Sequence, residues 1–186
     1  KIKTRVTDDV YEYATERTHN KFNPKRKWLI KHCQVWKNLY KRELIEDIPF
    51  IKGILFEDFP WWSRVMLRNP RVTVAPLPLY FYIPNFGGIV LGAKQLRIMK
   101  SLCAGIESAY KAYKESATDA EFKHFNREFL WPFIIIMMQK VRGLSDTKDI
   151  DVARKSVTDV YKSGACDAPC NGRAKKYKRR IEEFIK

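Results

Sequence analysis

Apolar and polar positions along the chain predict mainly helices, with a short amount of strand in the first half. Thr7 and the acids after it suit the start of a helix over residues 7–19. In WLIKHCQVWKNLYKREL (28–44), apolar residues recur at both helical and strand spacings, so periodicity does not choose between them. We expect a strand there that passes into a helix near Leu39.

A clearer helical pattern begins at Asp58. An aspartate can cap a helix, and Pro60 fits a first turn because its missing N–H would be unpaired there. The helix is expected to continue to Asn69. The β-branched and aromatic runs RVTVA (71–75) and LPLYFYI (77–83) then predict two short strands or one broken strand.

Strand signals end at about Gly92, and the remaining sequence is helical in pattern. Thr118 and Glu121 form a capping box that opens a helix through Val141, with a kink at Pro132. Other helices are expected within 93–116, near 146–163 and near 172–185. The prediction is therefore an α+β, mostly helical fold, with a mixed segment over 1–91 and a helical extension over 92–186.

Composition indicates a folded, strongly basic protein. Hydrophobic residues make up 45% of the 186 positions, which is typical of a chain that can build a core. The formal charge of +15 creates a potential that attracts phosphate groups of nucleotides, nucleic acids or lipids. The longest apolar run, FLWPFIIIMM (129–138), has about half of the roughly 20 residues that cross a bilayer.

Cysteines and histidines give no sign of a metal site. Four scattered cysteines indicate reduced thiols and a cytoplasmic location, and the three histidines lack the paired spacing of a zinc site. The first residues, KIKTRVTDDV, contain neither an initiator Met nor a signal peptide. We therefore expect the chain to be a piece of a longer protein.

Two segments carry the strongest functional signal. VWKNLYKRELI (35–45) is followed by GILFEDFPWWSRVMLRNPRVTVAPLPLYFYIPN (53–85). An aromatic stretch, a Glu-Asp pair, a helix and a Leu-Tyr-x-Tyr strand come in that order. Residues 34–85 thereby resemble the C-terminal part of family 2 glycosyltransferases, which are inverting enzymes of bacterial polysaccharide synthesis with the GT-A fold.

The resemblance implies roles for five residues. Asp58 matches the general base of the family and Glu57 its neighbour, while Trp36, Trp61 and Trp62 are candidate acceptor contacts. The substrates would be a nucleotide-sugar donor and a glycan or lipid-linked acceptor. Each residue also has a simpler interpretation: Asp58 as a helix cap, Glu57 as a solvated side chain, and the tryptophans as core.

The chain departs from the family pattern at two places. Lys37-Asn38 reverses the usual order, and Ile83 replaces an arginine, so no role of those side chains is carried over. The resemblance also implies that a nucleotide-binding half, with an Asp-x-Asp motif holding Mg²⁺ or Mn²⁺, would precede Lys1. We expect these 186 residues alone to bind neither metal nor donor.

The basic tail NGRAKKYKRRIEEFIK (171–186) can form an amphipathic helix. It could lie on the anionic inner face of the cell membrane, or pack on the body with a solvated basic face. A different function, a basic nucleic-acid-binding or helical interaction module without catalysis, remains the alternative. No nucleic-acid recognition signature is visible, so no nucleic-acid partner is expected, and the sequence leaves the oligomeric state open.

Overall fold

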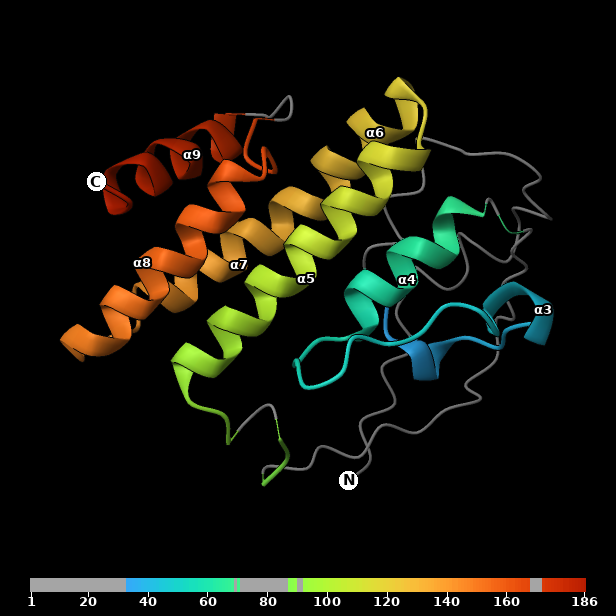
Figure 1. Ribbon diagram of the computed structural model, residues 1–186, viewed down its shortest axis with the longest axis horizontal. Helices are drawn as coiled ribbons and strands as arrows, with labels where there is room; N and C mark the ends of the chain where they lie inside the picture. The colour runs from blue at the N-terminus through green and yellow to red at the C-terminus, as the bar shows by residue number, and fades with distance from the viewer. Residues whose placement is uncertain (1–32, 69, 71–86, 90–91, 168–171) are drawn as a thin grey trace, which may run out of the picture.

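The computed structural model describes residues 33–68, 70, 87–89, 92–167 and 172–186, and the regular elements in these ranges are all helical (Figure 1). In chain order they are η1 (Val35–Lys37), α3 (Arg42–Ile45), α4 (Asp58–Leu67), α5 (Gln95–Ser116), α6 (Asp119–Phe125), η2 (Asn126–Leu130), α7 (Trp131–Val141), α8 (Thr147–Lys162) and α9 (Gly172–Phe184).

The prediction of an α+β fold is therefore wrong, because the part of the chain that the structure describes is all-α. The strand pair expected within 71–83 and the helix expected over 7–19 lie outside the described residues. The strand expected from residue 28 is tested only from Cys33 onward, where the structure has the 3₁₀ turn η1. Its backbone N–H groups bond locally, Lys37 N to Gln34 O at 3.1 Å and Asn38 N to Val35 O at 3.2 Å. Because these backbone groups bond within the turn, they are not available for hydrogen bonds to a neighbouring strand.

The helices expected after Gly92 are confirmed, because strong local signals define them. Glu121 N donates to Thr118 Oγ1 at 3.4 Å and Thr118 N donates to Glu121 Oε2 at 2.9 Å, which completes the capping box of α6. Asp146 caps α8 by accepting from Lys148 N at 2.8 Å and Asp149 N at 3.1 Å.

Near Pro132 we expected a kink, and the structure has a π-helical stretch, η2, in the turn before it. Proline has no N–H to donate to the preceding turn, and its ring presses on the carbonyl four residues earlier. Widening that turn relieves the clash while α6, η2 and α7 remain one continuous helical segment.

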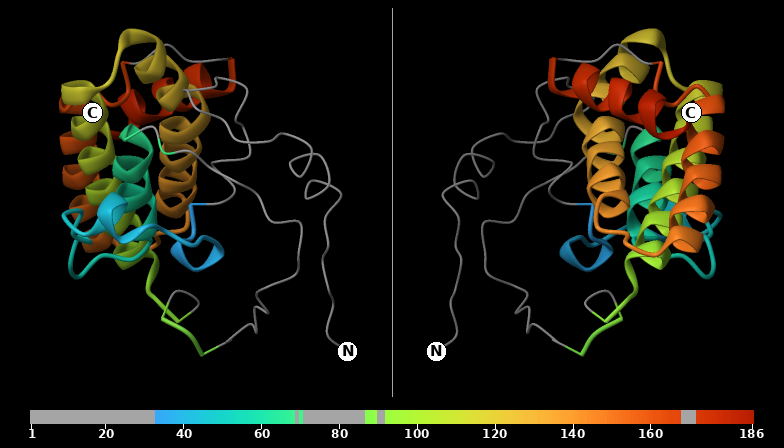
Figure 2. Two further views of the ribbon diagram at one scale, coloured as in Figure 1. Left: turned by 90° about the vertical axis from the view of Figure 1, so that its right-hand side faces the viewer. Right: turned by 90° about the vertical axis from the view of Figure 1, so that its left-hand side faces the viewer.

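The core forms around α5, which packs against α4, α7 and α8, while α9 contacts α7 and α8. Figure 2 shows α4, α5, α7 and α8 side by side with α9 lying across one end. Met99 and Ile106 of α5, Ile134 and Met137 of α7 and Val157 of α8 are fully buried there. The helical extension and the segment bearing Asp58 therefore meet through the α4–α5 contact.

Among the described helices, none combines the length and apolar character that a bilayer crossing requires.

Candidate active site

The Glu57–Asp58 pair lies where the chain turns sharply into α4. Phe56, directly before the pair, has φ of 60°, a left-handed conformation that a bulky side chain adopts only at a cost. The turn is closed by Phe59 N donating to Phe56 O at 3.2 Å and Trp61 N donating to Glu57 O at 3.3 Å. The strained residue thus sets the direction in which the helix begins.

The two acids occupy different positions from those expected. Asp58 was predicted to cap the helix, but Glu57 holds the cap position, without a side-chain cap bond, and Asp58 is the first helical residue. Pro60 is then the third helical residue, still among the first four N–H positions that lack an intrahelical acceptor. Capping in the ordinary sense therefore does not account for Asp58.

The Asp58 carboxylate is partly buried, whereas Glu57 is exposed. Burial is the largest cause and raises the pKa of Asp58, and the negative charge of Glu57 raises this pKa further. Backbone hydrogen bonds at Asp58 and at Val35 lower the pKa in part. The net direction is upward, so Asp58 holds a proton more strongly than a solvated aspartate does. Such a shift at a partly buried carboxylate is a common feature of catalytic bases.

The segment before α3 supplies the neighbours of Asp58. Burial raises the pKa of Cys33 to about 11, and the charge of Asp58 adds to that shift. Burial likewise raises the pKa of Tyr40 to about 12, against a hydrogen bond with Asn38, with smaller upward contributions from Cys33 and Asp58. Cys33, Val35 and Tyr40 therefore lie within electrostatic reach of the carboxylate. Sequence reasoning missed this grouping, although all three residues belong to the CQVWKNLY stretch that precedes the acids.

Trp61 is part of the packing between α4 and the loop before it. Its side chain is 2% exposed, and its Nε1–H donates to Ile48 O at 2.8 Å. Tyr40 packs edge-on against the ring at 5.1 Å between centroids, and Phe50 stacks on it at 4.9 Å. In this arrangement the ring has no free face for a sugar.

Trp62 lies on another side of the same helix and is 3% exposed, stacked on Phe129 at 5.3 Å. Trp36, on η1, is 39% exposed, with Lys37 Nζ 5.2 Å from its ring centroid. Of the three predicted acceptor contacts, Trp36 is the one that offers aromatic surface to solvent.

Helix α4 is held firmly against the bundle just behind the acids. Phe59 stacks on Phe133 of α7 with ring centroids 3.6 Å apart. Gly105 of α5 faces the same turn, since a Cβ placed on it would lie 3.6 Å from atoms of both Phe59 and Pro60. The carboxylate of Asp58 is thus carried by a rigid element, as a positioned base requires.

Within the described ranges, no group of three or more His, Cys, Asp or Glu residues is placed to hold a metal ion. Glu57 and Asp58 alone offer too few ligands for a dedicated divalent site.

Comparisons of the chain with protein-family models, with curated proteins and with solved structures found no match. The candidate site is accordingly defined by its own residues: a partly buried Asp58 at the start of a fixed helix, an exposed Glu57 beside it, and the Cys33–Tyr40 segment against it.

Proposed function

We propose that this chain is the acceptor-side part of an inverting glycosyltransferase in which Asp58 is the general base. The observation that carries the proposal is the partly buried Asp58 carboxylate, its pKa raised by burial, on the first turn of α4. The order of motifs over residues 34–85 supplies the second support.

In the proposed reaction, the acceptor hydroxyl attacks the anomeric carbon of the donor sugar. Asp58 takes the hydroxyl proton as the new C–O bond forms, and the bond to the nucleoside diphosphate breaks with its electron pair leaving on the phosphate oxygen. Attack opposite the leaving group inverts the configuration. A positioned base contributes about 10²- to 10⁴-fold to such a step, and a raised pKa makes the carboxylate a stronger base.

Glu57 and Trp36 take supporting roles in this proposal. The negative charge of Glu57 raises the pKa of Asp58 and thereby its affinity for the proton. The exposed ring of Trp36 gives the apolar face of an acceptor sugar a surface to pack on. Trp61 and Trp62 support the site through the core instead.

The resemblance assigns donor binding, with Mg²⁺ or Mn²⁺, to a segment that would precede Lys1. When bound, that ion would neutralise charge on the leaving diphosphate. The reaction would take place in the cytoplasm or at the inner face of the cell membrane, where the acceptor is a glycan or a lipid-linked sugar.

The test compares Asp58→Asn with wild type in the full-length protein. Transfer of radiolabelled sugar is measured from a panel of UDP- and GDP-sugars to glycan and lipid-extract acceptors. We expect about a 10²- to 10⁴-fold loss of turnover with the fold intact by circular dichroism. The matched control is Glu57→Gln, which removes an exposed neighbouring charge and should lose far less activity. Turnover near wild type in Asp58→Asn, or no transfer by the wild type from any donor, would refute the proposal.

A further inference from the structure

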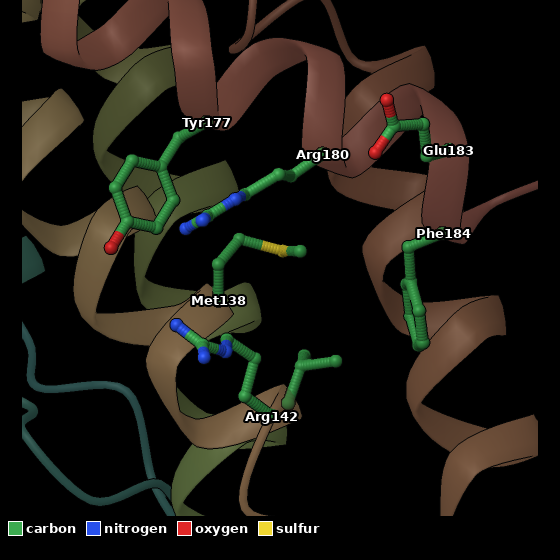
Figure 3. Close-up of a pocket in the computed structure, with 7 residues that line it drawn as sticks. Met138, Arg142, Tyr177, Arg180, Glu183 and Phe184 are labelled. Carbon is green, nitrogen blue, oxygen red and sulfur yellow. The ribbon is translucent and has the colours of Figure 1, made fainter.

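A groove of about 330 Å³ lies between α7 and α9, remote in sequence from Asp58 (Figure 3). Its floor is apolar, formed by Met138 and Val141 of α7 with Tyr177 and Phe184 of α9. Figure 3 shows Met138 at the centre, between the ring of Tyr177 and that of Phe184.

Two arginines border this floor. Arg142 reaches in from the end of α7 and Arg180 from α9, and Figure 3 shows the Arg180 guanidinium above the Met138 side chain and the Arg142 guanidinium below it. Arg180 lies over the ring of Tyr177, with its Cζ 5.2 Å from the ring centroid. Neither arginine forms an ion pair in the part of the chain that the structure describes. Two positive charges beside an apolar floor therefore have no anionic partner there.

The acid at the rim of the groove is engaged elsewhere. Glu183 Oε1 lies 3.7 Å from Arg179 Nε on α9. In Figure 3 its carboxylate lies on the far side of Met138 from the guanidinium groups of Arg142 and Arg180. The groove thus keeps its positive character.

More basic residues follow the same edge of α9. Arg173 and Lys176 are exposed and stand seven and four positions before Arg180, a spacing that places them in one row on a helix. The opposite edge, toward α8, is neutralised, because Lys178 Nζ pairs with Asp167 Oδ1 at 2.9 Å. Arg173, Lys176 and Arg180 thus form one basic row on α9 that borders the groove.

We propose that this groove binds an anionic phospholipid at a bilayer surface, with the phosphate between Arg142 and Arg180 and the first methylenes on the apolar floor. Guanidinium groups bind phosphate oxygens in a bidentate manner, which suits this pair. The volume is at the small end for ligand sites, so it accommodates a headgroup and the start of a chain while the rest stays in the bilayer. The apolar lining of the groove favours a lipid over a nucleic-acid backbone, which would use the two charges alone. The proposal does not depend on transferase activity.

The experiment is co-sedimentation of the 186-residue chain with vesicles of phosphatidylcholine, with and without phosphatidylglycerol. Wild type should bind only the anionic vesicles, and Arg142→Gln/Arg180→Gln should bind them about 30-fold more weakly, since each basic residue near the surface is worth about fivefold. Glutamine keeps most of the side-chain length, and circular dichroism verifies the fold of each variant.

The matched control is Lys155→Gln/Lys162→Gln, which removes two charges from the solvent face of α8. Both lysines are exposed and seven positions apart, on the side of α8 opposite its buried Ala153, Val157 and Val160. This variant should keep wild-type binding within a few fold, because screening limits distant charges to about 10 Å.

Four results would overturn the proposal. The first is an equal loss of vesicle binding in both double variants, and the second is wild-type binding to uncharged vesicles. The third is release from vesicles by millimolar inorganic phosphate at matched ionic strength, and the fourth is tighter binding to a DNA duplex that also requires Arg142 and Arg180. The first would indicate diffuse electrostatic attraction. The third would indicate a site for free phosphate, and the fourth a nucleic-acid surface.

Discussion

Gly105→Ala tests the contact that holds the candidate base in place. Gly105 lies within the 22-residue helix α5, opposite the first turn of α4. A Cβ added there would lie 3.6 Å from Phe59 Cδ1 and 3.6 Å from Pro60 Cδ, which is an ordinary van der Waals distance. Alanine should therefore fit without moving α4.

The expected effect is a gain in stability. Alanine is favoured over glycine in a helix interior by about 0.8–1.0 kcal/mol, because it loses less backbone entropy on folding. For a domain of 150–250 residues, about 1 kcal/mol corresponds to a rise of about 2–4 °C in Tm. The extra methyl group also fills space between α5 and α4, which adds in the same direction.

Thermal and urea unfolding, followed by circular dichroism, measure the change against Gly164→Ala as a control. Gly164 has φ of +88°, and a Cβ there would lie 2.8 Å from Tyr110 Oη, so that variant should lose at least about 1 kcal/mol. A lower Tm for Gly105→Ala would show that α4 lies closer to α5 than the structure has it. The fixed position of the first turn of α4 against the bundle would then lose its support.

Trp61→Phe removes the donor to Ile48 O and should cost about 1–3 kcal/mol in urea unfolding; a raised KM with unchanged stability would show that the ring contacts acceptor instead. Thr118→Ala should cost about 1 kcal/mol through loss of the capping box, measured by the same unfolding assay, and Ser at this position should restore most of it. Asp58→Asn should be more stable than wild type at neutral pH, because burial raises the folded pKa above the ordinary 3.8 and ionisation then costs stability. That advantage should shrink as the pH falls toward the unfolded pKa, and an advantage that grows on acidification would contradict the direction of the shift. Calorimetric titration of the 186-residue chain with UDP- and GDP-sugars should give no saturable heat, since the proposed function places the donor site outside these residues.

Helices with strong local signals were predictable from the sequence. Thr118 and Glu121 define the start of α6 through side-chain bonds that need no tertiary contact, and Asp146 does the same for α8. The start of α4 was predicted within one residue of the observed position. These elements depend on neighbours three or four positions away, which the sequence displays directly.

The strand expected around Val35 was wrong because the form of that segment is set by tertiary contacts. The stretch around Val35 shows both periodicities, and the structure uses it as a turn whose residues cover the start of α4. Sequence periodicity contains no information on such a docking, because the burial comes from a helix more than twenty positions later.

The tryptophan pair shows the same limit at the candidate site. Residues 61 and 62 point about 100° apart on a helix, so at most one of the two rings could face a single cleft. The structure covers both, since Tyr40 and Phe50 pack on Trp61 while Phe129 packs on Trp62. A helix enclosed from two directions by separate segments cannot be recognised from its own sequence.

This enclosure narrows where chemistry on α4 can take place. Arg64 Nη2 donates to Pro49 O at 2.9 Å, and Arg68 Nη2 pairs with Asp47 Oδ2 at 2.6 Å, so the polar side chains farther along the helix hold the preceding loop. The aromatic side chains of the helix are buried against that loop and the bundle. Its first turn is where a carboxylate is neither paired with a cation nor fully covered, and Asp58 occupies that turn. A catalytic role for α4 therefore depends on Asp58, and replacing this one carboxylate decides it.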